Sequence, residues 1–455
     1  MSSGGRRVRA SSLVEAARAR LWPLPVACVV LAAVAGVLLP LLDEVLVGRL
    51  PAFVETVVFG GGAAAARDIL TSIAGAFMTV SSLTFSLTVV TLQLASSQYS
   101  PRLLRTFASD RAVQVTLGVF LGSFAYALVV LRTVRTATET TPEFVPKLSV
   151  SLSVVLALVG VVTLVVFLAH LARKIRIEPV LVDVHEEASS MVGGHARGET
   201  VPPWLQGRTD GLEVVSTRTG FVTRADGDGL VALAHARDAV VDLVASPGSA
   251  VVPGALLARL LPRHPPPSGS GSGELPAGSG AHDASLERDV RRAVVVGDER
   301  TGTQDPMYGL RQLADVAMRA VSSSLNDPTT AVHAITHLRA LTVEVLRHGV
   351  GDALLRDEDG EVRVVLRRGG LADVLDLVVG HPLHYGHGDP MVVCALLQLL
   401  ADVAEVVGPG APDRGLVLAA HARVLAAAGP LLEDERWAVL VRAASARVDA
   451  ADGGS

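Results

Sequence analysis

Four long apolar stretches in the first 175 residues constrain this chain more than any other feature. A helix needs roughly 20 apolar residues to cross about 30 Å of hydrocarbon, at about 1.5 Å per residue. We therefore predict an α-helical integral membrane region over residues 21–175, with the lipid bilayer as its first partner. Its four spans are expected at about Leu21–Leu42, Ile69–Leu94, Ala112–Leu131 and Leu148–Leu171.

The remainder is expected to be a soluble α+β region. From about Leu212 to Leu261, short apolar runs alternate with turn dipeptides, which predicts a small β-rich unit within residues 176–262, after an initial helix. Residues 263–284 are rich in Pro, Gly and Ser, as in a flexible linker. Residues 285–455 predict a mainly helical domain. Its helices are expected over 308–321, 328–347, 371–378, 390–407, 414–428 and 433–448.

The distribution of basic residues predicts the orientation of the spans. If the N-terminus is cytoplasmic, the segments on the cytoplasmic side of the membrane contain eleven basic residues. They are Arg6, Arg7, Arg9, Arg18, Arg20, Arg102, Arg105, Arg111, Arg173, Lys174 and Arg176. The opposite loops hold Arg49, Arg67, Arg132, Arg135 and Lys147. Because basic residues concentrate in cytoplasmic loops, we expect a multi-pass protein of the inner (plasma) membrane. Residues 1–20 and the long C-terminal region would then both be cytoplasmic.

The second span carries an unusual number of hydroxyl residues and no charge. The face of interest comprises Thr79, Ser82, Thr84, Ser86, Thr88 and Thr91. Hydroxyls can line a hydrated path through a membrane. They can equally form a helix–helix seam, since small and hydroxyl residues permit close packing in lipid. Gly118 and Gly122 of the third span favour such a seam, and small residues of this kind suggest a homo-oligomer.

A second group of polar residues lies in the helical C-terminal region. It comprises Arg300, Asp305, Tyr308, Arg311, Asp315, Asn326 and Asp327. Several of these residues share one face of a predicted helix and could form internal ion pairs, a subunit interface or a ligand-binding face. Asp305-Pro306, Asp327-Pro328 and Asp389-Pro390 are typical of helix starts, where aspartate accepts from free amides and proline fits the first turn.

Metal, cofactor and catalytic signals are weak. His381, His384 and His387 form a candidate metal site, but a loop of glycine and proline separates them and no HExxH motif occurs. The two cysteines, Cys28 and Cys394, fall in different regions, so we expect no disulfide. No cofactor motif and no nucleophile elbow is present, so the sequence does not support catalysis. With a net charge of −5 and no basic stripe, a nucleic-acid partner is not expected.

Two segments resemble a bacterial family of predicted membrane proteins, the domain-of-unknown-function family numbered 2254. They are LQLASSQYSPRLLRTFASDR (Leu92–Arg111) and GDERTGTQDPMYGLRQLADVAMRAVSSSLNDPTTA (Gly297–Ala331). The layout of spans, β-rich unit and helical end is similar over nearly the whole chain. The resemblance implies a membrane location and no particular activity.

Two functional hypotheses follow from these features. In the first, the chain is an oligomeric, channel-like membrane protein with a cytoplasmic regulatory domain. In the second, it is a membrane-anchored sensor or scaffold that binds a cytoplasmic partner through its C-terminal region.

Overall fold

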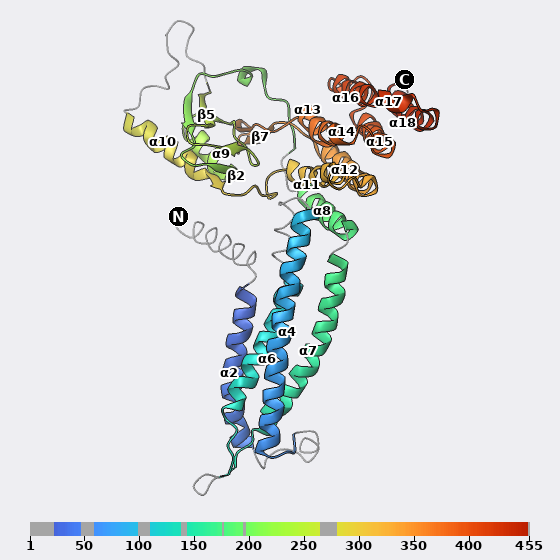
Figure 1. Ribbon diagram of the computed structural model, residues 1–455. Helices are drawn as coiled ribbons and strands as arrows, with labels where there is room; N and C mark the ends of the chain where they lie inside the picture. The colour runs from blue at the N-terminus through green and yellow to red at the C-terminus, as the bar shows by residue number, and fades with distance from the viewer. Residues whose placement is uncertain are drawn as a thin grey trace. The chain divides into compact units, whose positions relative to one another are not determined.

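The structure is a computed structural model that describes residues 22–46, 59–98, 110–137, 143–174, 177–193, 197–263 and 280–453. The chain divides into two compact units, Met1–Arg176 and Ile177–Ser455 (Figure 1). The predicted architecture is confirmed: apolar helices come first, followed by a region with sheets and a helical C-terminal part. The expected linker over 263–284 lies mostly outside the described residues, and α10 (Gly280–Ala293) begins within it.

The described residues of unit 1 form a bundle of four long helices. They are α2 (Pro23–Leu46), α4 (Ala63–Gln98), α6 (Arg111–Leu131) and α7 (Lys147–Lys174). The central helix is α6, which packs against the other three. At 36 residues, α4 is about 54 Å long, well beyond what a single crossing requires.

Glycines allow α2 and α6 to approach closely, as the GxxxG pattern predicts. A Cβ added to Gly118 would lie 2.9 Å from the Cys28 Sγ, and one added to Gly122 would lie 3.4 Å from the Cys28 carbonyl oxygen. On the other helix, a Cβ at Gly36 would lie 3.0 Å from the Val129 side chain. Close backbone contact of this kind is how helices associate where surrounding lipid is as apolar as the side chains.

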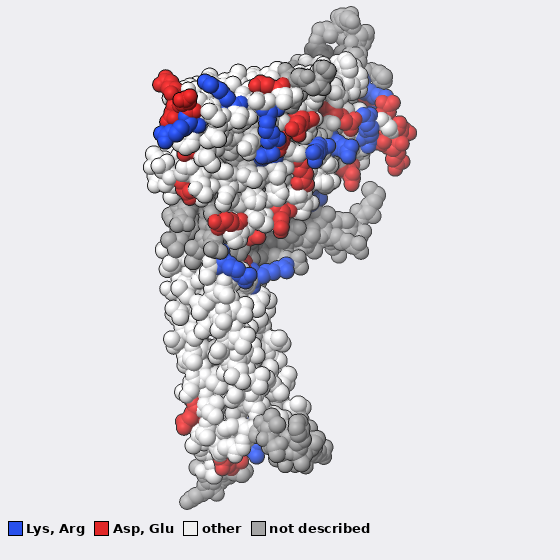
Figure 2. Space-filling model, turned by 90° about the vertical axis from the view of Figure 1, so that its right-hand side faces the viewer, with Lys and Arg blue, Asp and Glu red and all other residues white. Residues whose placement is uncertain are grey.

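The outer surface of unit 1 is suited to lipid. Large apolar side chains are exposed along the helices, including Leu31 at 71%, Leu158 at 64% and Val162 at 63%. Figure 2 shows one face of this bundle, where charged side chains are sparse along the length and gather toward the ends. Apolar surface on this scale is unstable against water and stable against hydrocarbon.

Five described helices are long and apolar enough to cross a membrane, judged by length and composition. Four are the helices of unit 1. The fifth is α15 (Pro390–Val407), which packs against α12 (Pro328–His348), α16 (Arg414–Ala427) and α18 (Glu435–Gly453) within unit 2. Leu396, Leu397 and Leu400 on α15 are completely buried there.

Unit 2 opens with α8 (Ile177–Val192) and contains two small sheets. A five-stranded sheet has the order β1-β5-β3-β8-β7, and a three-stranded sheet has the order β4-β2-β6. The strands are β1 (Leu212–Val215), β2 (Gly220–Ala225), β3 (Ala239–Leu243), β4 (Ala250–Val251), β5 (Leu256–Pro262), β6 (Val294–Gly297), β7 (Ala353–Arg356) and β8 (Val362–Leu366). With α9 (Gly227–His235) and α10, the sheets enclose one apolar core that includes Val222, Leu230 and Leu260.

Three of these strands come from the region that the sequence predicts to be mainly helical. The β7–β8 hairpin joins the larger sheet because β8 pairs in parallel with β3, setting Val241 opposite Val364. Likewise, β6 pairs with β2. The β-rich part of unit 2 is therefore completed by segments that follow the Pro/Gly/Ser-rich stretch.

The predicted helices are otherwise present, and their starts are capped as the Asp-Pro dipeptides predict. The remaining described helical elements are the 3-10 helix η1 (Pro203–Leu205), α11 (Met307–Ala320), α13 (Leu371–Leu375), the π-helical turn η2 (Asp376–Gly380), α14 (His381–Gly386) and α17 (Gly429–Leu432). The Asp327 carboxylate accepts from the Thr330 N–H at 3.1 Å, and Asp389 accepts from the Met391 N–H at 2.9 Å. Capping therefore accounts for these two aspartates without any chemistry.

Candidate functional site

The hydroxyl residues of α4 separate into an inner and an outer stripe. The inner stripe comprises Ser81, Thr84, Thr88 and Thr91, all less than 10% exposed. Three of these hydroxyls donate to carbonyls of the preceding turn, as in Ser81 to Phe77 at 2.6 Å and Thr88 to Thr84 at 2.8 Å. Among the described residues, the Thr84 Oγ1 has no hydrogen-bond partner. The inner stripe is thus mostly satisfied by its own helix.

The outer stripe lies on the opposite side of α4 and is exposed. Its members are Ser72, Gly75, Thr79, Ser82, Ser86 and Gln93. A Cβ added to Gly75 would meet nothing within 4 Å, and the Thr79 hydroxyl donates to the Gly75 carbonyl at 3.0 Å. The structure therefore divides the predicted face: Thr79, Ser82 and Ser86 point away from the bundle, whereas Thr84, Thr88 and Thr91 point into it.

Carboxylates from one element cap the helices of another throughout unit 1. Asp43, 3% exposed near the end of α2, accepts from the Leu148 N–H, the Ser149 N–H and the Ser149 hydroxyl at 2.8–3.0 Å. Glu143 accepts from the first amide of α4, Ala63, at 2.6 Å. Each carboxylate satisfies free amides and sits at the positive end of a helix.

At the opposite end of the bundle, Asp110 caps α6 and contacts α7. One carboxylate oxygen accepts from the Ala112 N–H at 2.8 Å, and the other lies 2.7 Å from the His170 Nε2. Sequence reasoning missed all three carboxylates, because each fell just outside a predicted span. The sequence feature that could have revealed these carboxylates is their position close to the ends of the apolar runs.

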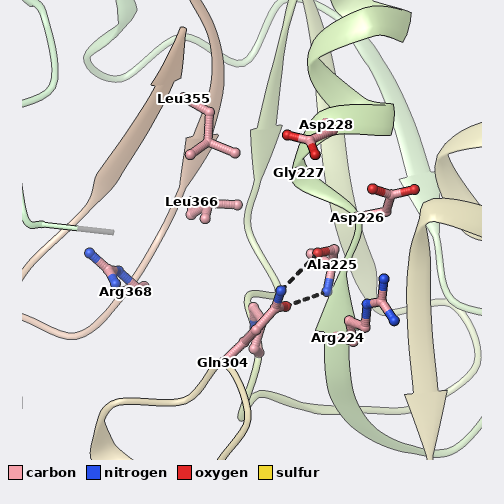
Figure 3. A pocket seen from close by; sticks show the side chains of 10 residues that line it. Arg224, Ala225, Asp226, Gly227, Asp228, Gln304, Leu355, Leu366 and Arg368 are labelled. Carbon is pink, nitrogen blue, oxygen red and sulfur yellow. Dashed lines mark hydrogen bonds between the residues drawn. The ribbon is translucent and has the colours of Figure 1, made fainter. Parts of the chain in front are cut away.

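In unit 2, the polar residues around Gly297–Asp305 fasten a loop to the three-stranded sheet. Arg300 pairs with the buried Asp305 at 2.5 Å, and Asp305 also accepts from the Met307 N–H at 3.0 Å. The Gln304 side chain binds both backbone groups of Ala225, accepting from its N–H at 2.8 Å and donating to its carbonyl at 3.2 Å (Figure 3). These residues are therefore occupied by contacts within the unit.

The turn at Gly248 completes this arrangement. Gly248 has a φ of +95°, and a Cβ there would lie 2.5 Å from the Asp305 carboxylate and 2.9 Å from the Arg300 guanidinium. Only glycine fits both the backbone conformation and the space. The ion pair and the turn thus hold each other in place.

The matching family covers most of this architecture. The family model described as "Predicted membrane protein (DUF2254)" matches residues 18–402, including all four helices of unit 1, both sheets and the Arg300–Asp305 loop. The chain belongs to this family. Uncharacterized proteins of Mycobacterium bovis and of Mycobacterium tuberculosis are each 32% identical over 450 residues, covering 96% of this chain and 82% of theirs. No solved structure matches the chain.

The other residues of the predicted polar face of this DUF2254 chain are dispersed. Tyr308, Arg311 and Asp315 are half-buried on α11. Asn326 adopts a left-handed conformation with φ 46° in the turn before α12, and Asp327 caps that helix. Within the predicted set, Asp305 pairs with Arg300, and its backbone carbonyl accepts from the Tyr308 N–H at 3.2 Å.

The ring nitrogens of His381 and His387, two of the three candidate metal-binding histidines, contact groups other than one another's rings. The His381 Nε2 lies 3.7 Å from the Asp376 carboxylate, and the His387 Nδ1 lies 3.3 Å from the His384 carbonyl. The described residues instead bring together His235, Asp357 and Asp359, with ligand atoms within 4.8 Å. This trio borders a cavity of about 830 Å³ beside α9 and the β7–β8 hairpin.

A cation at this trio would compete with an arginine. The Arg363 Nε donates to Asp357 at 2.7 Å, and the His235 Nδ1 lies 2.9 Å from the same carboxylate oxygen. Arg363 and His235 together hold the pKa of Asp357 well below its usual range. The carboxylate is therefore already neutralised from within the chain, so we assign no metal to it.

A buried serine–histidine contact on the helical end was also missed by sequence reasoning. The His421 Nε2 on α16 lies 2.8 Å from the Ser445 Oγ on α18, and its Nδ1 lies 4.0 Å from the Asp449 carboxylate. His421 and Ser445 are only 7% and 8% exposed, and neither residue lines the cavity beside α9 and the β7–β8 hairpin. The contact therefore joins α16 to α18 in the interior of the helical end.

Proposed function

We propose that this family member is a homo-oligomeric, channel-like protein of the inner membrane. In this proposal α2, α4, α6 and α7 are the spans, and the outer stripe of α4 from each copy faces a polar path shared between copies. The observation that carries the proposal is the exposure of Thr79, Ser82 and Ser86 on a helix otherwise flanked by large apolar side chains. Exposed polar groups are disfavoured in hydrocarbon and recur where helices meet or line water.

The bundle of one copy favours a path between copies over a path through its own centre. Leu70, Phe120 and Tyr126 fill the described interior and are at most 1% exposed. The Phe77 and Phe120 rings pack with their centroids 5.9 Å apart beside the inner stripe. Because three of the four inner hydroxyls donate to carbonyls of their own helix, the inner stripe has little capacity left to replace the hydration shell of an ion.

Ion flux into liposomes reconstituted with the full chain tests this proposal. Ser82→Leu combined with Ser86→Leu should remove most of the flux, because apolar branches would replace hydroxyls on the shared path. The matched control is Thr84→Val combined with Thr88→Val, which preserves shape on the inner stripe and should leave flux unchanged. Equal flux in both double variants, or a purified protein that is monomeric in detergent, would refute the proposal.

We further propose that both termini are cytoplasmic, with residues 1–20 and unit 2 on the inner side of the membrane. The basic residues that bracket the spans support this orientation, as the positive-inside rule requires. A tag on the last residue should resist protease added to intact cells and become cleavable after the membrane is opened. Cleavage in intact cells would reverse the assignment.

A second candidate is a membrane-anchored sensor or scaffold, supported by exposed apolar side chains on the helical end of unit 2. Val439 and Leu440 on α18 are 61% and 46% exposed, and Leu416 on α16 is 39% exposed. Surface of this kind favours a protein partner. A full-length protein that conducts no ions, and that loses a specific partner on Val439→Asp, would favour this candidate over the channel.

A further inference from the structure

A cavity of about 310 Å³ opens at the end of unit 1 where α2 and α6 finish. Its apolar wall includes Val37 and Leu41 of α2 and Val129 of α6. Val37 and Leu41 are 53% and 56% exposed, on the bundle's outer surface. In a membrane protein, an apolar hollow on this surface is accessible to lipid chains.

The rim of the same cavity is charged. Arg132 directly follows the last residue of α6, Arg135 follows three positions later, and Glu44 lies in the last turn of α2. All three side chains are exposed, and none of them forms an ion pair with another described residue. The rim therefore carries a formal charge of about +1 that the described part of the chain does not neutralise.

The position of the rim matches the headgroup region of a bilayer. Arg132 and Glu44 stand where the long apolar segments of α6 and α2 end, so their charged groups leave the hydrocarbon while Val37 and Leu41 remain in it. Backbone hydrogen bonds between Arg135 and Phe144, both 3.0 Å long, fix the segment that carries the second arginine. The two arginines are thus held beside one apolar hollow.

We propose that this cavity binds one anionic phospholipid with a glycerol headgroup. The phosphodiester accepts from the Arg132 and Arg135 guanidiniums, whose planar donor groups suit phosphate oxygens. The headgroup hydroxyls donate to the Glu44 carboxylate, and an acyl chain lies along Val37 and Leu41. A ligand with one negative charge brings the occupied rim close to neutrality, which a zwitterionic phospholipid would not do.

The ordinary alternative is that both arginines only extend to the interface and meet any headgroup equally. Native mass spectrometry of the purified full chain distinguishes the two. The chain would be exchanged into nanodiscs of phosphatidylglycerol or phosphatidylcholine with identical acyl chains, and the retained lipid counted after gentle release. We expect one phosphatidylglycerol to be retained and phosphatidylcholine to be lost.

Variants locate the retained lipid. Arg132→Gln combined with Arg135→Gln should abolish the preference for phosphatidylglycerol, whereas Arg173→Gln, an exposed arginine at the other end of the bundle, should preserve it. Should the double variant fail to fold, Leu41→Trp serves instead, because it fills the hollow from an exposed position and should also displace the lipid.

Three outcomes would overturn the assignment. They are equal retention of the two lipids by the unmodified chain, unchanged retention in both cavity variants, and thermal stabilisation by inorganic phosphate equal to that by phosphatidylglycerol. The last outcome would show that the site binds phosphate alone and that contact between an acyl chain and the apolar wall adds nothing to binding.

Discussion

The two units of this chain differ in what their carboxylates stabilise: helix starts in unit 1, and in unit 2 ion pairs as well as the capped starts of α12 and α15. In unit 1, Asp43 and Glu143 accept from amides at the start of a distant helix, and Asp110 caps the start of α6, which it directly precedes. In unit 2, aspartates pair with arginines across strands and loops, as Arg367 does with both Asp242 and Asp352. The caps of unit 1 satisfy amides that the start of each helix leaves free, whereas the ion pairs of unit 2 join strands and loops that are partly exposed.

The largest expected effect comes from removing one partner of a buried pair in unit 2. Arg300→Ala leaves Asp305, 3% exposed, without its counter-ion and loosens the loop on β2. Breaking a buried pair costs about 3–5 kcal/mol, and because Arg300 is partly exposed we expect the lower end. Hydrogen exchange in urea should show the lower stability as faster exchange of the backbone amides of β2 and α11. Arg292→Ala, in an exposed pair with Asp289, should change stability by less than about 1 kcal/mol.

A smaller effect is expected from the carboxylate caps of unit 1. Asp43→Ala removes three hydrogen bonds at the start of α7, so the melting temperature in detergent should fall by the equivalent of about 2–3 kcal/mol. The melting temperature of the Asp43→Asn variant should lie between those of the original chain and of Asp43→Ala, because asparagine keeps one acceptor oxygen. Asp68 on α4 is exposed and lies outside the cavity at the end of α2 and α6, so Asp68→Ala should leave the melting temperature unchanged. Equal melting temperatures of the Asp43→Ala and Asp68→Ala variants would mean that the caps are not what stabilises the bundle.

The smallest effect concerns pH in unit 2. Burial lowers the pKa of His337, and its neighbours His185 and His333 lower it further. A histidine whose folded pKa lies below its unfolded value binds fewer protons when folded, so stability should fall as pH drops through the unfolded value of about 6.5. Thermal melts at pH 7.5 and 5.5 should show this loss in the original chain and a shallower loss in His337→Gln. Parallel pH profiles would exclude this histidine as the cause.

The sequence predicts the helices of unit 1 well because lipid imposes a requirement that hydropathy reports directly. Helical periodicity places Thr84 and Ser86 on different stripes of α4, but the sequence could not show which of the two stripes faces the bundle. Asp43 was equally hidden, because its role depends on the start of α7, more than one hundred residues away.

In unit 2, short strands were missed where long helices surround them. The run Val362–Leu366 is rich in β-branched residues, and this signal could have revealed β8. Its parallel pairing with β3 depends on contacts between distant parts of the chain, which no local pattern encodes. The Arg300–Asp305 pair illustrates the same limit. The sequence shows that polar residues are grouped together, and the fold shows that these two form an ion pair with each other.

The parallel pairing of β3 with β8 has a consequence for how this protein can be divided. A cut within residues 264–279 would leave β3 on one fragment and β8 on the other, although they are adjacent strands of one sheet. The C-terminal fragment alone would present an unpaired strand edge, which is prone to aggregate. The two pieces, produced together, should reassociate through that edge, so the region offers a natural point for a split-protein reporter.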